Sequence, residues 1–270
     1  MSDGTPSGSQ RIADAFARAK ARGSCALMPF ITAGFPDLAT TERLLRELPA
    51  AGADLIELGI PFSDPIADGP VIAESMHQAL LSGTTPESVF ACVRAAKPSV
   101  PVLAMVSVSI VERIGAAPFL ERCAESGLAG IIVPDAGPEF WPEILAAAPI
   151  SATKLGIVEL VAPTTPRDRI ERIVRDSTGF IYLLARAGIT GERADAPDVA
   201  ERIAAIRAIG PARIAVGFGI SSAEHVAAVG RHADGAIVGS AIVRRMTEAA
   251  QRGESAADAA LSLVKTLQRA

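Results

Sequence analysis

Near its start the chain reads CALMPFIT (25–32), DLATTERLLRELPAAG (37–52) and ADLIELGI (53–60). The first and third stretches are short apolar runs, and the second has the longer amphipathic pattern of a helix. A strand, a helix and a second strand in this order are typical of a parallel sheet, because parallel strands need a crossover connection. The alternation continues along the chain and predicts strands at residues 26–32, 53–59, 100–106, 129–133, 154–158, 180–184, 213–217 and 235–238.

Eight strand and helix repeats favour a closed (β/α)8 TIM barrel over an open doubly wound sheet. The 270 residues are close to the roughly 250 of one such barrel, so we expect a single domain over 1–270, with 1–9 as a flexible tail. We expect an extra helix over 12–22, before the first strand. Long connections are expected after the second strand (60–85) and the sixth (185–197), where barrel enzymes hold functional residues.

Composition and charge exclude several classes of function. A net charge of -4 offers no basic surface, so we expect neither a nucleic acid nor an anionic membrane as partner. No apolar run reaches the roughly 20 residues of a membrane span, and the polar start MSDGTPSGSQ has no signal core, which predicts a cytoplasmic protein.

Metal and disulfide chemistry are not expected either. The three cysteines are far apart in sequence and predict reduced thiols, and the three histidines fall in or beside predicted helices, away from strand ends. These residues are Cys25, Cys92, Cys123, His77, His225 and His232.

Glu57 is the first candidate for catalysis. Side chains alternate along a strand, so Leu55 and Glu57 share one face while Ile56 and Leu58 share the other. The apolar pair suits the helix-covered outside, which directs Glu57 into the barrel near the catalytic end of its strand. The alternative is a core glutamate paired with a basic residue.

The following loop, PFSDPIADGP (61–70), contains Asp64 and Asp68 and is stiffened by three prolines. A stiff loop can hold Asp68 beside Glu57. Both aspartates could instead form turns through their own backbone. The absence of a serine–histidine–acid arrangement, a P-loop or a dinucleotide fingerprint leaves carboxylate acid–base catalysis as the simplest interpretation.

Two glycine turns, VGFGISS (216–222) and IVGSAIV (237–243), each end a strand and open a helix. Free amides at such helix starts bind anions, and the loops after strands seven and eight form the common phosphate site of barrels. Ordinary tight connections would look similar.

The long segment after strand six, IYLLARAGITGERADAP (181–197), predicts a lid over the barrel mouth, with an ordinary surface loop as the alternative.

Seven motifs, in family order, resemble those of the tryptophan synthase α subunit. They are MPFITAGFPD (28–37), AGADLIELGIPFSDPIADGPVI (51–72), GIIVPDAGPE (130–139), VAPTTP (161–166), GITGER (188–193), VGFGISS (216–222) and GAIVGSAIV (235–243). The resemblance implies a lyase that splits indole-3-glycerol phosphate by retro-aldol chemistry into indole and glyceraldehyde 3-phosphate.

The resemblance also implies a role for each matched residue. Glu57 matches the glutamate that protonates the indole ring at C3 and then accepts a proton, and Asp68 matches the aspartate that binds the indole N–H. Substrate-binding positions are matched by Phe30, Tyr182, Leu184, Thr190, Gly191, Phe218, Gly219, Gly239 and Ser240. The chain departs from the pattern in LAMVSVSIVERIG (103–115), where Val106 replaces an expected tyrosine, and at Ala185 and Ala187, where small hydroxyl residues are common.

No cofactor or metal is implied for this chain. The family implies a β subunit that carries pyridoxal phosphate and receives the indole, in an α2β2 heterotetramer, with the loop around Asp64 as a docking element. The alternatives are a free-standing indole-glycerol-phosphate lyase and a weakly active binding or allosteric subunit. A metal-dependent sugar-phosphate barrel is disfavoured because the histidines are misplaced as ligands.

Overall fold

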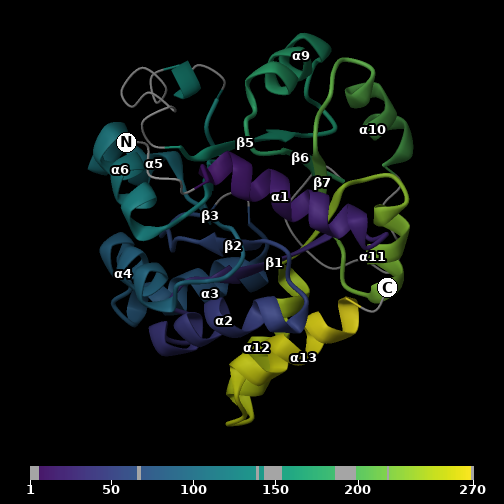
Figure 1. Cartoon of the computed structure of the whole chain (residues 1–270). Coiled ribbons are helices and arrows are strands. Elements are labelled where there is room, and N and C mark those ends of the chain that lie inside the picture. The colour runs from purple at the N-terminus through teal and green to yellow at the C-terminus, as the bar shows by residue number, and fades with distance from the viewer. Residues whose placement is uncertain are drawn as a thin grey trace.

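Eight parallel strands form a closed barrel in a computed structural model that describes residues 6–65, 68–137, 140–142, 154–185, 199–217 and 219–268. Each strand pairs with the next, and β8 pairs with β1 to close the ring (Figure 1). The strands are β1 (Ala26–Thr32), β2 (Ile56–Gly59), β3 (Val102–Met105), β4 (Gly130–Ile132), β5 (Gly156–Val161), β6 (Ile181–Leu184), β7 (Ile214–Gly217) and β8 (Gly235–Val238). The predicted (β/α)8 barrel is confirmed.

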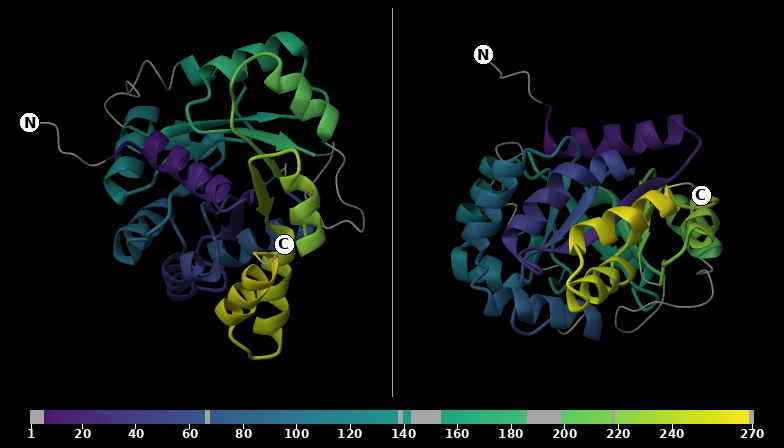
Figure 2. Two further views of the ribbon diagram at one scale, coloured as in Figure 1. Left: turned by 45° about the vertical axis from the view of Figure 1, so that its right-hand side comes forward. Right: turned by 90° about the horizontal axis from the view of Figure 1, so that it is seen from below.

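Helices cover the outside of this ring, and α1 lies across one of its ends (Figures 1 and 2). They are α1 (Gly8–Ala21), α2 (Leu38–Ala51), α3 (Pro70–Leu81), α4 (Pro86–Ala96), α5 (Val108–Ile114), α6 (Ala116–Ser126), α9 (Arg167–Asp176), α10 (Ala200–Arg207), α11 (Ala223–Gly230), α12 (Ser240–Gln251) and α13 (Ala256–Leu267). Within the described ranges, none of these helices has the length and apolarity needed to cross a membrane.

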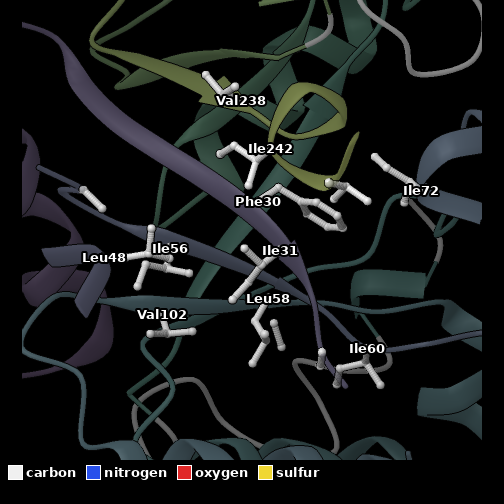
Figure 3. Close-up of a cluster of buried hydrophobic side chains, with 14 of the residues drawn as sticks. Phe30, Ile31, Leu48, Ile56, Leu58, Ile60, Ile72, Val102, Val238 and Ile242 are labelled. Atoms are coloured by element: carbon white, nitrogen blue, oxygen red, sulfur yellow. The ribbon is translucent and has the colours of Figure 1, made fainter. Parts of the chain in front are cut away.

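Alternation along the strands divides the core into two layers. Leu55, Leu103 and Tyr182 belong to a cluster inside the barrel. Ile56 and Leu58 belong to the larger cluster between the strands and the helices, part of which Figure 3 shows. Because side chains alternate between the two faces, a register shift of one residue would move each layer to the wrong side of the sheet. Such a shift would be costly, since burying each of these side chains contributes roughly 1.5–3 kcal/mol.

Helix α1 closes the barrel at the amino ends of the strands. Ile12 and Phe16 join the interior cluster, and the rings of Phe16 and Phe180 meet edge to face at 5.6 Å. The helix begins earlier than the predicted residue 12, because the Ser7 side chain caps it and the Gly8 amide donates to the Lys154 carbonyl at 2.6 Å. Residues 8 and 9 of the expected tail therefore belong to the helix.

The connection expected at 60–85 contains a whole helix, α3. Its first residue is Pro70, whose fixed φ suits a first helical position. Ile72, Met76 and Ala79 follow at helical spacing and are buried against the barrel. The segment between β2 and α3 therefore covers residues 60–69 at the carboxyl end of β2, and its described residues, 60–65, 68 and 69, lie in no helix or strand.

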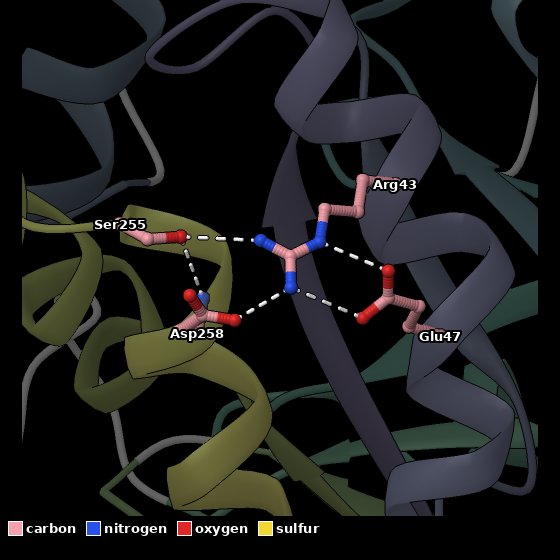
Figure 4. A network of polar contacts seen from close by, with 4 residues as sticks. All are labelled: Arg43, Glu47, Ser255 and Asp258. Carbon is pink, nitrogen blue, oxygen red and sulfur yellow. Dashed lines mark hydrogen bonds and ion pairs between the residues drawn. The ribbon is translucent and has the colours of Figure 1, made fainter.

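Helix α13 ends the described chain and lies beside α12 and α2 (Figure 2). Arg43 of α2 donates to Glu47 in its own helix, at 2.9 Å, and to Ser255 and Asp258 at the start of α13, at 3.2 and 2.5 Å (Figure 4). These side chains are largely exposed, so water and salt screen each ion pair and it contributes little to the stability of the fold. The buried apolar face of α13 contributes more.

Candidate active site

Glu57 lies on β2 and faces the inside of the barrel. Its Cα is in register with Phe30 of β1 and Leu103 of β3. The side chain is fully buried, and neither carboxyl oxygen accepts a hydrogen bond from the described residues. Burial raises the pKa of Glu57 well above its ordinary value, since the charged form loses its hydration. The interior position expected from strand parity is confirmed. The alternative was a core glutamate paired with a basic residue, and among the described residues no basic side chain pairs with Glu57.

Asp68 lies in the irregular segment after β2. Its amide donates to the Pro65 carbonyl at 3.1 Å, so its backbone forms a turn while the side chain is half-buried beside the barrel mouth. Burial and the nearby carboxylate of Asp135 raise the pKa of Asp68 to about 6. Asp64, by contrast, is exposed. The two aspartates of this loop therefore have different environments.

Tyr182 brings the two acids into one site. It is buried on β6, and its pKa is raised first by burial and then by the nearby carboxyl groups of Glu57 and Asp68. Leu184 follows on the same face, half-buried against the interior cluster. On β1, the Phe30 ring fills the space beside Gly59, where an added Cβ would come within 2.6 Å of its Cζ atom. The shared parity predicted for Tyr182 and Leu184 is confirmed.

The turns after β7 and β8 differ in their free amides. Helix α11 is capped, because the Ser222 side chain accepts from the His225 amide at 3.3 Å. Helix α12 begins at Ser240 after Gly239, and no side chain caps its first turn. Uncapped amides at a helix start favour an anion. Gly219, in the neighbouring turn, has a φ of +83°, a backbone conformation that favours glycine.

Three of the predicted ligand residues, Thr190, Gly191 and Phe218, lie outside the described residues, as does Ala187. The unusual Val106 is buried and lines a cavity together with Asp68. Ala185 is also buried, directly after β6.

The histidines lie in or beside helices, as the sequence predicted. His77 is in α3 and His225 in α11, while His232 follows α11. The three cysteines are free thiols, and two of them are buried. Over the described ranges, no group of three or more histidine, cysteine or acidic side chains is arranged to hold a metal ion.

Sequence reasoning did not single out Ser107 and Asp135. Asp135 follows β4 and accepts a hydrogen bond from the Ser107 hydroxyl at 2.7 Å. Both line the cavity that contains Asp68, together with Ile60, Phe62, Asp64, Pro65, Met76, Met105, Val106 and Pro134. A sequence signal for Asp135 was available, because VPDAG (133–137) places an acid shortly after a predicted strand. Such a position lies at the end of the barrel where catalytic side chains gather.

The sequence of this chain is similar to those of known proteins over most of its length. A sequence model of the family described as "Tryptophan synthase alpha chain" matches residues 16–270. A tryptophan synthase alpha chain from Acaryochloris marina (strain MBIC 11017) is 45% identical over 243 residues, which cover 88% of this chain and 90% of the relative. One from Prochlorococcus marinus (strain MIT 9313) is 46% identical and covers 88% of each chain.

Solved structures share the fold over nearly the whole length. Tryptophan synthase subunit alpha from Legionella pneumophila superposes with a TM-score of 0.87 at 30% identity, covering 96% of this chain and 97% of that one. A structure of Mycobacterium tuberculosis tryptophan synthase matches with a TM-score of 0.86 at 30% identity and covers 98% of both chains.

Proposed function

Because this chain belongs to the tryptophan synthase alpha chain family, it is a lyase of tryptophan biosynthesis, and we propose that it cleaves indole-3-glycerol phosphate at the carboxyl end of its barrel. The observation that carries this proposal is the arrangement of Glu57, Asp68 and Tyr182. A buried, unpartnered carboxyl group and a second acid face one apolar interior, where a flat aromatic ring fits and proton transfer is shielded from water.

Glu57 supplies the proton that makes indole a leaving group. Burial favours its protonated form, which is the form that can donate to C3 of the ring. The carboxylate left behind then accepts the proton of the hydroxyl on the glycerol carbon bonded to C3. As that hydroxyl becomes an aldehyde, the C–C bond breaks and its electron pair returns to the ring. Glu57 ends the cycle protonated, as it began.

Asp68 stabilises the ring nitrogen during this step. With a pKa of about 6, it is mostly a carboxylate at neutral pH and can accept a hydrogen bond from the indole N–H. Protonation at C3 places positive charge on that nitrogen. The interaction therefore strengthens toward the transition state, which lowers the barrier more than it strengthens substrate binding.

The substrate phosphate binds at the turns after β7 and β8. The uncapped start of α12, at Gly239 and Ser240, supplies amides and a partial positive charge, and Gly219 lies in the adjacent turn. Phe30, Tyr182 and Leu184 surround the indole ring. We assign Thr190, Gly191 and Phe218 to ligand contacts on the family resemblance alone.

We further propose that the chain works in the cytoplasm with a tryptophan synthase β subunit, as an α2β2 heterotetramer. The chain itself is assigned no cofactor, and pyridoxal phosphate belongs to the β subunit that consumes the indole. The solved relative from Mycobacterium tuberculosis is described as tryptophan synthase, which supports an assembly. The exposed Asp64 on the loop after β2 is available for docking.

The test is release of indole from indole-3-glycerol phosphate by the purified chain, measured alone and with a β subunit. We expect release in both, and stimulation by the β subunit. Equal rates with and without it would favour a free-standing lyase, and no release under either condition would favour a binding subunit. Either outcome would overturn the corresponding part of the proposal.

A further inference from the structure

Asp135 is held rigidly beside the mouth of the barrel. It follows β4, and its two carboxylate oxygens accept one hydrogen bond each, from the Ser107 hydroxyl at 2.7 Å and from the Val108 amide at 2.9 Å. Ser107 is the N-cap of α5, so Asp135 lies at the positive end of that helix. These two donors fix the orientation of the Asp135 carboxyl group.

Asp135 and Asp68 line the same small cavity from different sides. Asp68 enters it from the segment after β2, and Asp135 from the end of β4, with Met105 and Val106 of the intervening strand end between them. Apolar side chains, among them Ile60 and Met76, also line the cavity. Asp135 is itself exposed to water, but the apolar walls on the Asp68 side screen charge poorly, so the two carboxylates influence each other more than two fully hydrated ones would.

We propose that Asp135 is a positioning residue for the lyase reaction, whose fixed negative charge makes Asp68 a stronger hydrogen-bond acceptor for the indole N–H. This inference rests on the proposed function. Asp135 does not touch the substrate in this scheme and acts only through Asp68. Ser107 takes part only by orienting the Asp135 carboxyl group, which the Val108 amide also holds.

The charges around Asp68 agree with this assignment. Asp135 raises the pKa of Asp68, in addition to burial. The other titratable groups of the site on the described elements are Glu57 on β2, Tyr182 on β6, whose pKa Asp68 influences, and Asp64, which lines the same cavity as Asp68. Glu57 and Tyr182 have raised pKa values and so favour their neutral forms, while Asp64 is exposed to water. Asp135 is also exposed, but two hydrogen bonds hold it in place and its charge raises the pKa of Asp68, so we assign the effect on Asp68 to Asp135.

The test compares the titration of Asp68 in the whole chain and in Asp135→Asn. Asparagine is the same size and can still accept from Ser107 or Val108, but it carries no charge. Carboxyl-labelled aspartate is followed by 13C NMR without substrate, and the Asp68 signal is assigned from its loss in Asp68→Asn. We expect the midpoint of Asp68 to fall from about 6 by roughly 0.5 pH unit or more.

The acid limb of kcat/KM should move to lower pH by the same amount, since this limb reports groups of the free enzyme. Titration of the substrate phosphate is common to both proteins and cancels in the comparison. Two matched variants separate charge from geometry. Ser107→Ala keeps the charge and should leave the Asp68 midpoint near 6, and Asp64→Asn removes an exposed acid from the same cavity and should shift it little.

An unchanged Asp68 midpoint in folded Asp135→Asn would overturn the inference. An equal shift in Asp64→Asn would also overturn it, because the effect would then be one of general charge. Far-ultraviolet circular dichroism of each variant establishes that it is folded. If the wild-type chain releases no indole, the proposed function fails, and the substrate-free titration still reports whether Asp135 tunes Asp68.

Discussion

Replacing Glu57 by glutamine should have opposite effects on catalysis and on stability. Glutamine has nearly the same shape but cannot donate a proton to C3 or accept one from the glycerol hydroxyl. Loss of such a general acid and base lowers turnover by about 10²- to 10⁴-fold. The buried carboxyl group, however, has no hydrogen-bond partner among the described residues, so the fold does not depend on it.

The effect on stability follows from proton linkage. The pKa of Glu57 is raised in the folded chain above the ordinary value of 4.5. Between these two pKa values the folded state binds more protons than the unfolded state, so the free energy of unfolding decreases as pH rises. The decrease is about 1.4 kcal/mol for each pH unit in this window. It is absent below the unfolded pKa and complete once the pH passes the folded one.

Glu57→Gln lacks this linkage, so its stability relative to wild type should increase with pH at about that slope. Urea unfolding at pH 5, 6 and 7, followed by circular dichroism, measures the difference, and all other titrating groups cancel. A constant difference across these pH values would refute the reasoning, since it would mean that the folded protein holds Glu57 as a stabilised carboxylate. Near-normal indole release would refute the catalytic role.

Glu159 provides a matched control on the opposite side of the sheet. It is a second buried glutamate, on β5, and its neighbours Val158 and Leu160 face the barrel interior while it faces outward. Burial raises its pKa to about 7, partly offset by Arg172 and Arg169. Glu159→Gln should therefore show a similar stability slope between pH 4.5 and about 7 with unchanged turnover. A large loss of turnover in this variant would contradict the assignment of catalysis to the barrel interior, and Glu159→Gln could then not serve as a control.

Three further substitutions test other parts of the site and fold. Asp68→Asn should lower indole release while inorganic phosphate still inhibits with similar affinity, and an equal loss of phosphate affinity would indicate a general structural role. Gly217→Ala should lower kcat/KM and cost about 1–3 kcal/mol, because the added Cβ would overlap the Tyr182 phenol; unchanged values would contradict this packing. Ile12→Ala should cost about 2–5 kcal/mol in urea unfolding but keep turnover at 25 °C, since Ile12 is buried at the far end of the barrel.

The sequence by itself determined the barrel and the direction of Glu57. Apolar runs alternate with amphipathic ones because each strand must be covered by a helix, and this periodicity can be read locally. Parity placed Leu55 and Glu57 inside and Ile56 and Leu58 outside, as the structure has them. The helical pattern of the surrounding segments also placed the histidines in or beside helices, away from the strand ends.

The boundaries of elements depended on contacts that the sequence does not display. Helix α1 begins at Gly8 because the Lys154 carbonyl, far away in sequence, accepts the hydrogen bond of the Gly8 amide. Helix α3 occupies a stretch read as a connection, since Met76 and Ala79 find an apolar surface to bury against. The glycine turns looked alike in sequence, but Ser222 caps α11 and no side chain caps α12.

Only the tertiary structure decided the electrostatics of the site. Asp68 and Asp135 are far apart in sequence, and their shared cavity exists because β2 and β4 flank β3 in the closed ring. Glu57 keeps its proton because packing removes water and leaves its oxygens without a partner among the described residues. Periodicity depends on neighbours along the chain, whereas a pKa depends on the water and charges that folding brings to or removes from a group.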